Sequence, residues 1–318
     1  MNNREDSFVH VKDIKDGQRI RGLFLVKEKR VSRTRNGKPF IAMVFADNSG
    51  RIDAKIWDNV KDMSPLFEEG DVIEVVGIAN SYKGQVQLSI PWLKRVPEEE
   101  IDPLMFVESV SVDPEALVSD LKDCLSSIKS VHLIKLVRTF TDDSRFMESF
   151  KRAPAAKKFQ PNYLGGLLEH TLSVCRLAIM VASHYSELDH DLLIVAAFLH
   201  DIGKIRELDA GLNGDYTDEG RLIGHIVLGI SMLDEKISLI DDFPVDLALK
   251  LKHLILSHHG QFEFGSPKRP KFLEAFALNL IDDLDAKING LGRFMKKDQH
   301  EGSWTDFNRL FGRYFYKD

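Results

Sequence analysis

A chain of 318 residues, 43% hydrophobic and 29% charged, is long for one core and ordinary in composition, so we expect a globular protein of two domains. Its net charge of −6 excludes a protein that binds polyanions over its whole surface, and its two cysteines exclude a disulfide framework. No run of about 18 apolar residues predicts a membrane span, and the polar start is unlike a signal peptide, so we expect a cytoplasmic protein that does not bind membranes.

The first ninety-odd residues predict short strands separated by turns. Apolar or alternating segments recur there, each bounded by Gly, Asn or Asp residues that favour turns. Strands are expected at 22–26, 40–45, 51–57, 72–76 and 86–90. With a short helix at 59–67, after the third strand, this order is typical of a closed Greek-key barrel of the OB type.

Basic residues are concentrated in one part of this predicted barrel. Residues 18–40 contain eight basic side chains and one acidic side chain, and the portion 30–38 is expected to be an exposed hairpin tip. Basic grooves with aromatic platforms hold single strands without reading their sequence, so we predict nucleic-acid binding. The alternatives are that the cations are merely solvated and that Trp57 fills the barrel core. The candidate contacts are Lys29, Arg30, Arg33, Arg35, Lys38, Phe40, Trp57 and Tyr82.

A short acidic segment flanked by prolines, Pro97–Pro103, suits an extended spacer. Beyond it the apolar period changes from two to about 3.6, which predicts helices. We therefore expect an all-β domain at 1–96, a linker at 97–112 and an all-α domain at 113–318. The expected helices include 113–128, 131–140, 226–237 and 272–288, with others starting near 165, 192 and 244.

Histidines and carboxylates fall at the ends or on the faces of the predicted helices. The apolar run Leu192–Leu199 ends directly in His200 and Asp201, which a buried helix would place at the rim of a core. Imidazoles and carboxylates that meet in a helical bundle are a standard metal centre, and such buried charges are costly without a cation. The candidate ligands are His170, His200, Asp201, His225, His258, His259 and Asp282.

Helix geometry predicts which neighbours of these ligands stay outside the centre. Adjacent helical residues diverge by about 100°, so His258 and His259 are not expected to be equivalent ligands, and His258 is favoured. Asp283 and Asp285 are expected to point away from Asp282 and to be solvated. Nitrogen and oxygen donors suit Mn, Fe, Co or Zn, whereas Mg prefers more oxygen.

The order of these motifs resembles the HD-domain metal-dependent phosphohydrolases. More narrowly, it resembles the YhaM family of 3′-to-5′ exoribonucleases, in which an OB fold precedes an HD domain, so the expected fold is an OB-fold barrel followed by an HD-type helical domain. The resemblance covers almost the whole chain and lies at 153–156, 166–167, 199–204, 216–220, 224–226, 257–260, 265–268, 284–287 and 313–317. The chain departs from the family pattern at Gln160-Pro161 and at Asn279, where family members often carry histidines.

The resemblance implies an enzyme that degrades single-stranded RNA, with single-stranded DNA as a further candidate, from the 3′ end to nucleoside 5′-monophosphates. It implies two divalent ions, Mn²⁺ first and Fe, Co, Zn or Mg as alternatives. One ion would be held by His170, His200, Asp201 and Asp282, and the other by Asp201, His225 and one or both of His258 and His259.

The resemblance also gives roles to residues beside the ions. Asp201 and Lys204 are the expected catalytic residues, with Lys204 neutralising charge on a phosphate oxygen; the alternative is a solvated lysine at a helix end. Lys268 and Arg269 are expected in a loop that contacts the strand, and a homo-oligomer is expected. The rival interpretations are a phosphohydrolase of small nucleotides and a non-enzymatic single-strand binder with a relic metal site.

Overall fold

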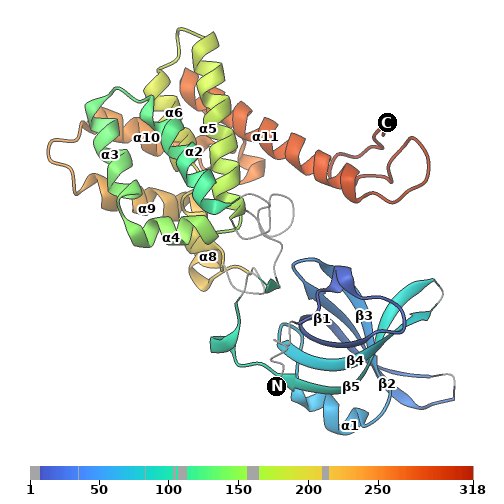
Figure 1. Ribbon diagram of the computed structural model, residues 1–318. Helices are drawn as coiled ribbons and strands as arrows, with labels where there is room; N and C mark the ends of the chain where they lie inside the picture. Colours follow the sequence, from blue (N-terminus) through green and yellow to red (C-terminus); the bar gives the residue numbers. More distant parts are fainter. Residues whose placement is uncertain are drawn as a thin grey trace. The chain divides into compact units, whose positions relative to one another are not determined.

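The computed structural model describes residues 8–34, 36–82, 84–102, 105–106, 113–155, 165–209 and 215–317. The chain divides into two compact units, an N-terminal β unit and a C-terminal helical unit (Figure 1). Half of the linker predicted at 97–112 lies outside the described residues, so the predicted boundaries stay predictions.

The β unit is a closed barrel with the strand order β1-β2-β3-β5-β4. Its elements are η1 (Val11–Asp13), β1 (Arg19–Arg33), β2 (Pro39–Asp47), β3 (Gly50–Ile56), α1 (Val60–Met63), η2 (Ser64–Leu66), β4 (Val72–Tyr82) and β5 (Gln85–Arg95). Only the β3–β5 pair is parallel among the described strands. A bulge between Val26 and Glu28 lets β1 pair with β4 through its first half and with β2 through its second half. The predicted OB-fold barrel, with its helix after the third strand, is confirmed.

The strands are longer than the predicted segments because their polar ends extend beyond the core. Apolar side chains from all five strands fill the barrel, and Phe24 stacks on Phe45 with ring centroids 5.7 Å apart. The ends of β1 and β4 carry exposed polar residues, which leave no apolar alternation to detect.

The described part of the predicted spacer is not an extended linker. Residues 98–100 form η3 (Glu98–Glu100), and Phe106 is buried against Leu25 and Val72 of the barrel. The backbone N–H of Asn48 also donates to the Met105 carbonyl over 2.9 Å. The prediction was wrong here because the acidic and proline-rich composition masked apolar residues that pack against distant strands.

The helical unit is built around α6. Its helices are α2 (Pro114–Ser126), α3 (Val131–Thr141), α4 (Ser144–Arg152), α5 (Gly166–His184), α6 (His190–Leu199), α7 (Lys204–Glu207), α8 (Asp218–Leu222), α9 (His225–Ile237), α10 (Val245–Ser257), η5 (Phe262–Phe264) and α11 (Leu273–Lys297). Every residue of α6 from Leu192 to Leu199 is buried, and α2, α3, α5, α10 and α11 pack around it. The end of α6 therefore lies inside the bundle, where His200 and Asp201 follow.

Two long helices complete this arrangement. By length and composition α5 could cross a membrane, but 56% of its most apolar stretch of 18 residues is buried inside the protein. α11 runs nine residues beyond the predicted end at Ile288, and Figure 1 shows its last turns leading away from the other helices. Its first half packs against α5, α6 and α10, which brings Asp282 to the bundle core.

Candidate metal centre

The structure brings all seven predicted ligand side chains together from separate helices. His170 lies in α5, His200 and Asp201 follow α6, His225 begins α9, His258 and His259 follow α10, and Asp282 lies in α11. Five of them, His170, His200, Asp201, His258 and Asp282, are buried. They form two groups of donor atoms that share Asp201.

The first group surrounds the Nε2 atoms of His170 and His200. Ligand atoms of His170, His200 and Asp201 all lie within 4.8 Å of one another. The two Nε2 atoms are 3.3 Å apart, and Asp282 Oδ1 lies 3.1 Å from His170 Nε2. Four donors from α5, α11 and the end of α6 therefore face one point.

The second group consists of His225, His258 and His259, whose ligand atoms also lie within 4.8 Å of one another. Asp201 stands between the groups. Its Oδ1 lies 3.5 Å from His258 Nε2 and 3.7 Å from His225 Nε2. Its Oδ2 lies 3.3 Å from His200 Nε2. One oxygen of the carboxylate thus faces each group.

The prediction that His258 and His259 are not equivalent ligands stays a prediction. α10 ends at Ser257, His258 follows it with helical dihedral angles, and Gly260 has a φ of +77°. Ligand atoms of both imidazoles nevertheless lie within 4.8 Å of one another and of His225. Both side chains can serve the second group.

Hydrogen bonds at Nδ1 fix the orientation of all five imidazoles. The acceptors are Asp285 Oδ2 for His170 (2.8 Å), the Ala197 carbonyl for His200 (2.8 Å), Glu207 Oε1 for His225 (3.0 Å), the Ile255 carbonyl for His258 (2.8 Å) and the Phe264 carbonyl for His259 (2.9 Å). Because a neutral imidazole carries one proton, a donating Nδ1 leaves a lone pair at Nε2. Each Nε2 is therefore presented as a metal ligand.

Buried polar atoms at the centre lack hydrogen-bond partners within the described part of the chain. They are Asp201 Oδ1, Asp282 Oδ1, His225 Nε2 and His258 Nε2. Leaving such atoms unpaired costs roughly 1–3 kcal/mol each, and converging lone pairs and carboxylates also repel one another. A divalent cation would satisfy them together, so the residues present fit a metal ion.

Electrostatics hold most of these groups in the protonation state that a metal ion needs. Burial raises the pKa of Asp201, but Lys204 and His200 outweigh it and hold this pKa well below its ordinary value. The pKa of Asp282 is likewise lowered, by His170 and His200 against the effect of burial. Burial and the neighbouring His258 lower the pKa of His259 to about 4.

His170 is the exception. Burial lowers its pKa, but the carboxylates of Asp282 and Asp285 beside the ring outweigh that effect and raise it to about 9. Without a cation, His170 therefore keeps a proton between itself and the carboxylates. A bound metal ion would replace that proton.

Lys204 is buried, and its Nζ lies 2.6 Å from Asp201 Oδ2. The alternative of a solvated lysine at a helix end is therefore wrong. The turn before it is tight, because a Cβ on Gly203 would lie 1.9 Å from the His225 carbonyl oxygen. Only glycine lets α7 begin this close to α9, which keeps Lys204 beside the centre.

The expectation that Asp285 is solvated was also wrong. Asp285 is buried, and besides His170 it accepts a hydrogen bond from Ser173 Oγ. It lies three residues after Asp282, so the two side chains share a helix face. That spacing could have identified it. Asp283 is exposed, as the sequence predicted, and is paired with Lys287.

Two further residues support the ligands, and sequence reasoning assigned them no such role. Glu207 holds His225 through both its backbone N–H and Nδ1, each 3.0 Å away. Asn279 Nδ2 donates to the His258 carbonyl over 2.7 Å, and a Cβ on Gly260 would collide with the Asn279 amide at 2.5 Å. The departure at Asn279 thus contributes to the position of His258. Gln160-Pro161 lies outside the described residues.

The barrel carries an aromatic surface in the predicted place. Trp57 stacks on Phe40 with ring centroids 5.0 Å apart, outside the barrel core. Lys55 Nζ lies 5.4 Å from the centre of the Trp57 ring and 5.3 Å from that of Tyr82. The alternative of Trp57 as a core residue is therefore wrong, and the cation–π contacts join its ring to that of Tyr82.

Among the predicted basic contacts, Lys29 is corrected. Its Nζ is bonded to the carbonyls of Ser64 and Phe67, at 2.8 and 2.5 Å, and its side chain is 8% exposed. It fastens β1 to η2 and is not available to a phosphate. Of the others, Arg30 pairs with Glu28, Arg33 donates to the Gly37 carbonyl, Lys38 pairs with Asp58, and Arg35 lies outside the described residues.

Lys268 and Arg269 follow η5 and are exposed. The turn before them is anchored, since Ser266 is buried and its Oγ lies within hydrogen-bond distance of the Leu256 and Lys268 carbonyl oxygens, at 3.0 and 2.7 Å. The Arg269 guanidinium lies 4.9 Å from the centre of the Phe262 ring. The Arg269 side chain is therefore held against Phe262, three residues after His259.

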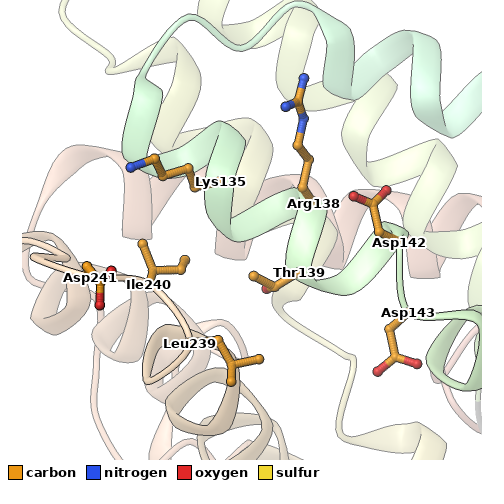
Figure 2. Close-up of a pocket in the computed structure, with 8 residues that line it drawn as sticks. All are labelled: Lys135, Arg138, Thr139, Asp142, Asp143, Leu239, Ile240 and Asp241. Atoms are coloured by element: carbon orange, nitrogen blue, oxygen red, sulfur yellow. The ribbon is translucent and has the colours of Figure 1, made fainter.

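A cleft of about 550 Å³ lies elsewhere in the helical unit, between α3 and the residues that follow α9 (Figure 2). Its lining combines Lys135 and Arg138 with the carboxylates of Asp142, Asp143 and Asp241, and it contains no histidine. It shares no residue with the metal centre. Asp143 is paired with Lys236 and caps α4, which gives it a structural role.

Comparison with known proteins agrees with this architecture. The HD domain family matches residues 167–287, and the OB-fold nucleic acid binding domain family matches residues 26–95. Fold and site together define an HD-domain protein with an N-terminal OB fold. Among solved structures, the second OB-fold domain of replication protein A from Methanococcus maripaludis is 15% identical and covers 30% of this chain and 98% of its own, with a TM-score of 0.24.

Two curated relatives match over nearly their whole length. The 3′-5′ exoribonuclease YhaM of Oceanobacillus iheyensis is 36% identical over 308 residues, which are 95% of this chain and 94% of that protein. The 3′-5′ exoribonuclease YhaM of Bacillus subtilis is 33% identical over 309 residues, 95% of each chain. The chain belongs to the YhaM family of 3′-5′ exoribonucleases.

Proposed function

We propose that the protein is a cytoplasmic, divalent-metal-dependent 3′-to-5′ exoribonuclease. It degrades single-stranded RNA to nucleoside 5′-monophosphates, and single-stranded DNA is a second candidate substrate. The observation that carries the proposal is the convergence of five Nε2 atoms and the carboxylates of Asp201 and Asp282 within metal-binding reach. The relatives named 3′-5′ exoribonuclease supply the reaction class and its direction.

We assign two ions to this centre, Mn²⁺ being the favoured metal because the donors mix imidazole nitrogen and carboxylate oxygen. His170, His200, Asp201 and Asp282 would hold one, and Asp201, His225, His258 and His259 the other. This division is supported by Asp201, which turns one carboxylate oxygen toward each group. When bound, two such ions lower the pKa of water and neutralise charge on a phosphate.

The chain's own residues would orient the substrate around these ions. Lys204 Nζ lies on Asp201 Oδ2, so it is within reach of a phosphate oxygen that approaches the same carboxylate. Its positive charge would stabilise the charge that develops on that oxygen in the transition state. Asp285 and Glu207 would keep His170 and His225 oriented throughout the reaction.

The barrel would bind the body of the strand. Phe40, Trp57 and Tyr82 offer rings on which bases stack, and Lys55 supplies a cation between two of them. Arg30, Arg33 and Lys38 lie along the β1–β2 hairpin as phosphate contacts. Stacking and phosphate contacts do not depend on base identity, so we expect little sequence preference.

We also propose that the protein is a homo-oligomer that associates through α11. Leu273, Phe276, Leu280, Leu284 and Ile288 are each at least 50% exposed and form one stripe on this helix. Beside the stripe is a largely apolar groove of about 580 Å³ between α5 and α11. The stripe is nearly symmetric about Leu280, so a second copy can pair with it in the antiparallel direction.

In such a pair Phe276 of one copy lies opposite Leu284 of the second copy. Glu274 of one copy likewise lies close to Lys287 of the second. An interface related by a twofold axis needs a self-complementary surface of this kind. We expect Leu280→Glu to lower the molecular mass measured by light scattering, with metal content unchanged. An unaltered mass in this variant would exclude α11 as the interface.

The test of the proposed activity is an assay of single-stranded RNA and DNA labelled at the 5′ end, with Mn²⁺ and with chelator. We expect progressive shortening of RNA and release of nucleoside 5′-monophosphates with Mn²⁺, and no shortening with chelator. Turnover of mononucleotides without shortening of RNA would favour the small-nucleotide phosphohydrolase. Binding without any hydrolysis would favour a single-strand binder with a relic site.

A further inference from the structure

Two phenylalanines are exposed beside the metal centre. Phe262 is 56% and Phe264 is 70% exposed, and both belong to η5, which begins three residues after His259. The two rings lie two residues apart in one short turn, and neighbouring exposed apolar groups are what binding sites present. Within the described residues, no ring or cation packs on the Phe264 ring, whereas Phe262 carries the Arg269 guanidinium.

The backbone under these rings is fixed. Gly265 ends η5 with a φ of +83°, and Ser266 is buried with its hydroxyl within hydrogen-bond distance of two carbonyl oxygens. The Gln261 N–H also donates to the His259 carbonyl over 2.9 Å. A turn with this many anchors holds Phe264 in one place relative to His259.

Phe264 is also close to the metal position. Its carbonyl oxygen lies 2.9 Å from His259 Nδ1. With the width of the imidazole and a metal–nitrogen bond of about 2 Å, this oxygen lies within roughly 7 Å of an ion bound at Nε2. That is comparable with the distance between the phosphate and the base of one nucleotide.

Charge around η5 favours a nucleotide. Lys268 and Arg269 are exposed and form no ion pair within the described residues, although the whole chain has a net charge of −6. The one acidic residue of segment 261–269, Glu263, is exposed as well. Two unpaired cations next to an open aromatic ring match a phosphate next to a base.

We propose that Phe264 is the stacking platform for the base of the 3′-terminal nucleotide, and that Arg269, held on Phe262, contacts the adjoining phosphate. This inference rests on the proposed exonuclease function and names the element that positions its substrate. Stacking tolerates any base, which suits removal of successive nucleotides. The platform belongs to the helical unit and is separate from the stacking surface of the barrel.

The test compares two RNA oligomers that differ only at the 3′ end, one with a normal terminal nucleotide and one with an abasic ribose there. Stacking of one base corresponds to roughly 5- to 150-fold in affinity. We expect the wild-type protein to show a KM at least fivefold lower for the base-bearing end, and Phe264→Ala to lose that difference. Phe264→Trp should retain the difference in KM. The wild type and Phe264→Ala should hydrolyse the abasic RNA equally well.

Leu239→Ala is the control, because Leu239 is a large apolar side chain, 69% exposed, in the cleft of Figure 2, which shares no residue with the metal centre or η5. It should keep the wild-type preference, and metal content should be the same in all variants. A preference that persists in Phe264→Ala would overturn the platform. The platform would also be overturned if Phe264→Ala changed only the molecular mass of the protein, because η5 would then be a contact between protein chains. Failure of the wild-type protein to shorten either RNA would instead overturn the proposed function itself.

Discussion

The aromatic surface of the barrel and the metal centre of the helical unit are built in opposite ways. Phe40, Trp57 and Tyr82 are partly or well exposed on strands or at their ends, so the surface offers several rings to a ligand. The metal centre is buried, and its donors come from helices more than one hundred residues apart in sequence, each fixed by a second hydrogen bond. Substitutions should therefore weaken the barrel gradually and disable the centre at once.

The largest effect is expected at Asp201, because both donor groups use it. Asp201→Ala should reduce RNA hydrolysis on the order of 10³-fold or more, since loss of one electrostatic contact at a reacting centre already costs about 10² to 10³. Binding of single-stranded RNA, measured by fluorescence anisotropy, should stay within about twofold. Turnover near the wild-type rate would show that catalysis does not pass through this carboxylate.

Asp285 offers a sharper test, because Asp283 is a control two residues away. Asp285→Asn removes the negative charge beside His170 and leaves one oxygen acceptor where His170 Nδ1 and Ser173 Oγ need two, and such changes lower metal affinity or activity by roughly 10- to 100-fold. Asp283→Asn alters an exposed residue paired with Lys287 and should have no measurable effect. Metal affinity and kcat, measured in both variants, test whether Asp285 positions His170. Equal losses would mean that charge on α11, and not the orientation of His170, is what counts.

The raised pKa of His170 predicts how metal binding depends on pH. In the metal-free protein this pKa is about 9, above its ordinary value of 6.5. The protonated ring therefore stabilises the metal-free fold fully below about pH 6.5, and this contribution is lost as the pH rises through 9. Because metal must displace that proton, metal affinity should rise by up to about tenfold per pH unit in this window. Titrations with Mn²⁺ at several pH values would measure this rise in affinity. An affinity that does not change with pH would contradict the prediction.

The smallest effect is expected on the barrel. Trp57→Ala should weaken RNA binding by about 1–3 kcal/mol, the usual worth of one stacked base. Trp92→Ala is the control, because Trp92 is also an exposed barrel tryptophan but has no ring or cation packed on it within the described residues. Both can be measured in the Asp201→Ala background, which prevents degradation. Equal losses in the two variants would point to general destabilisation of the barrel.

Local patterns in the sequence were sufficient for the architecture and for the side chains that converge at the candidate metal centre. Strand alternation and helix periodicity reflect burial within one element, so the barrel and most helices could be predicted. The candidate ligands could be named because polar donors interrupt apolar helices, as His200 and Asp201 do after Leu199. Asp282 stands out in the same way within an apolar helix face.

The features that were missed depend on contacts between distant segments. Lys29 looks like any other basic hairpin residue, but carbonyls 35 and 38 residues away bind its ammonium group. Glu207 faces a histidine 18 residues later across a turn. No pattern within one segment of the sequence encodes these contacts.

The most direct test of the metal centre is the number of Mn²⁺ ions bound per chain, measured by equilibrium dialysis in the wild-type protein and in Asp201→Ala. The account predicts two ions in the wild type, weaker binding of both in the variant, and loss of RNA hydrolysis when chelator removes them. RNA hydrolysis that continues in a wild-type protein shown to hold no divalent metal would contradict it.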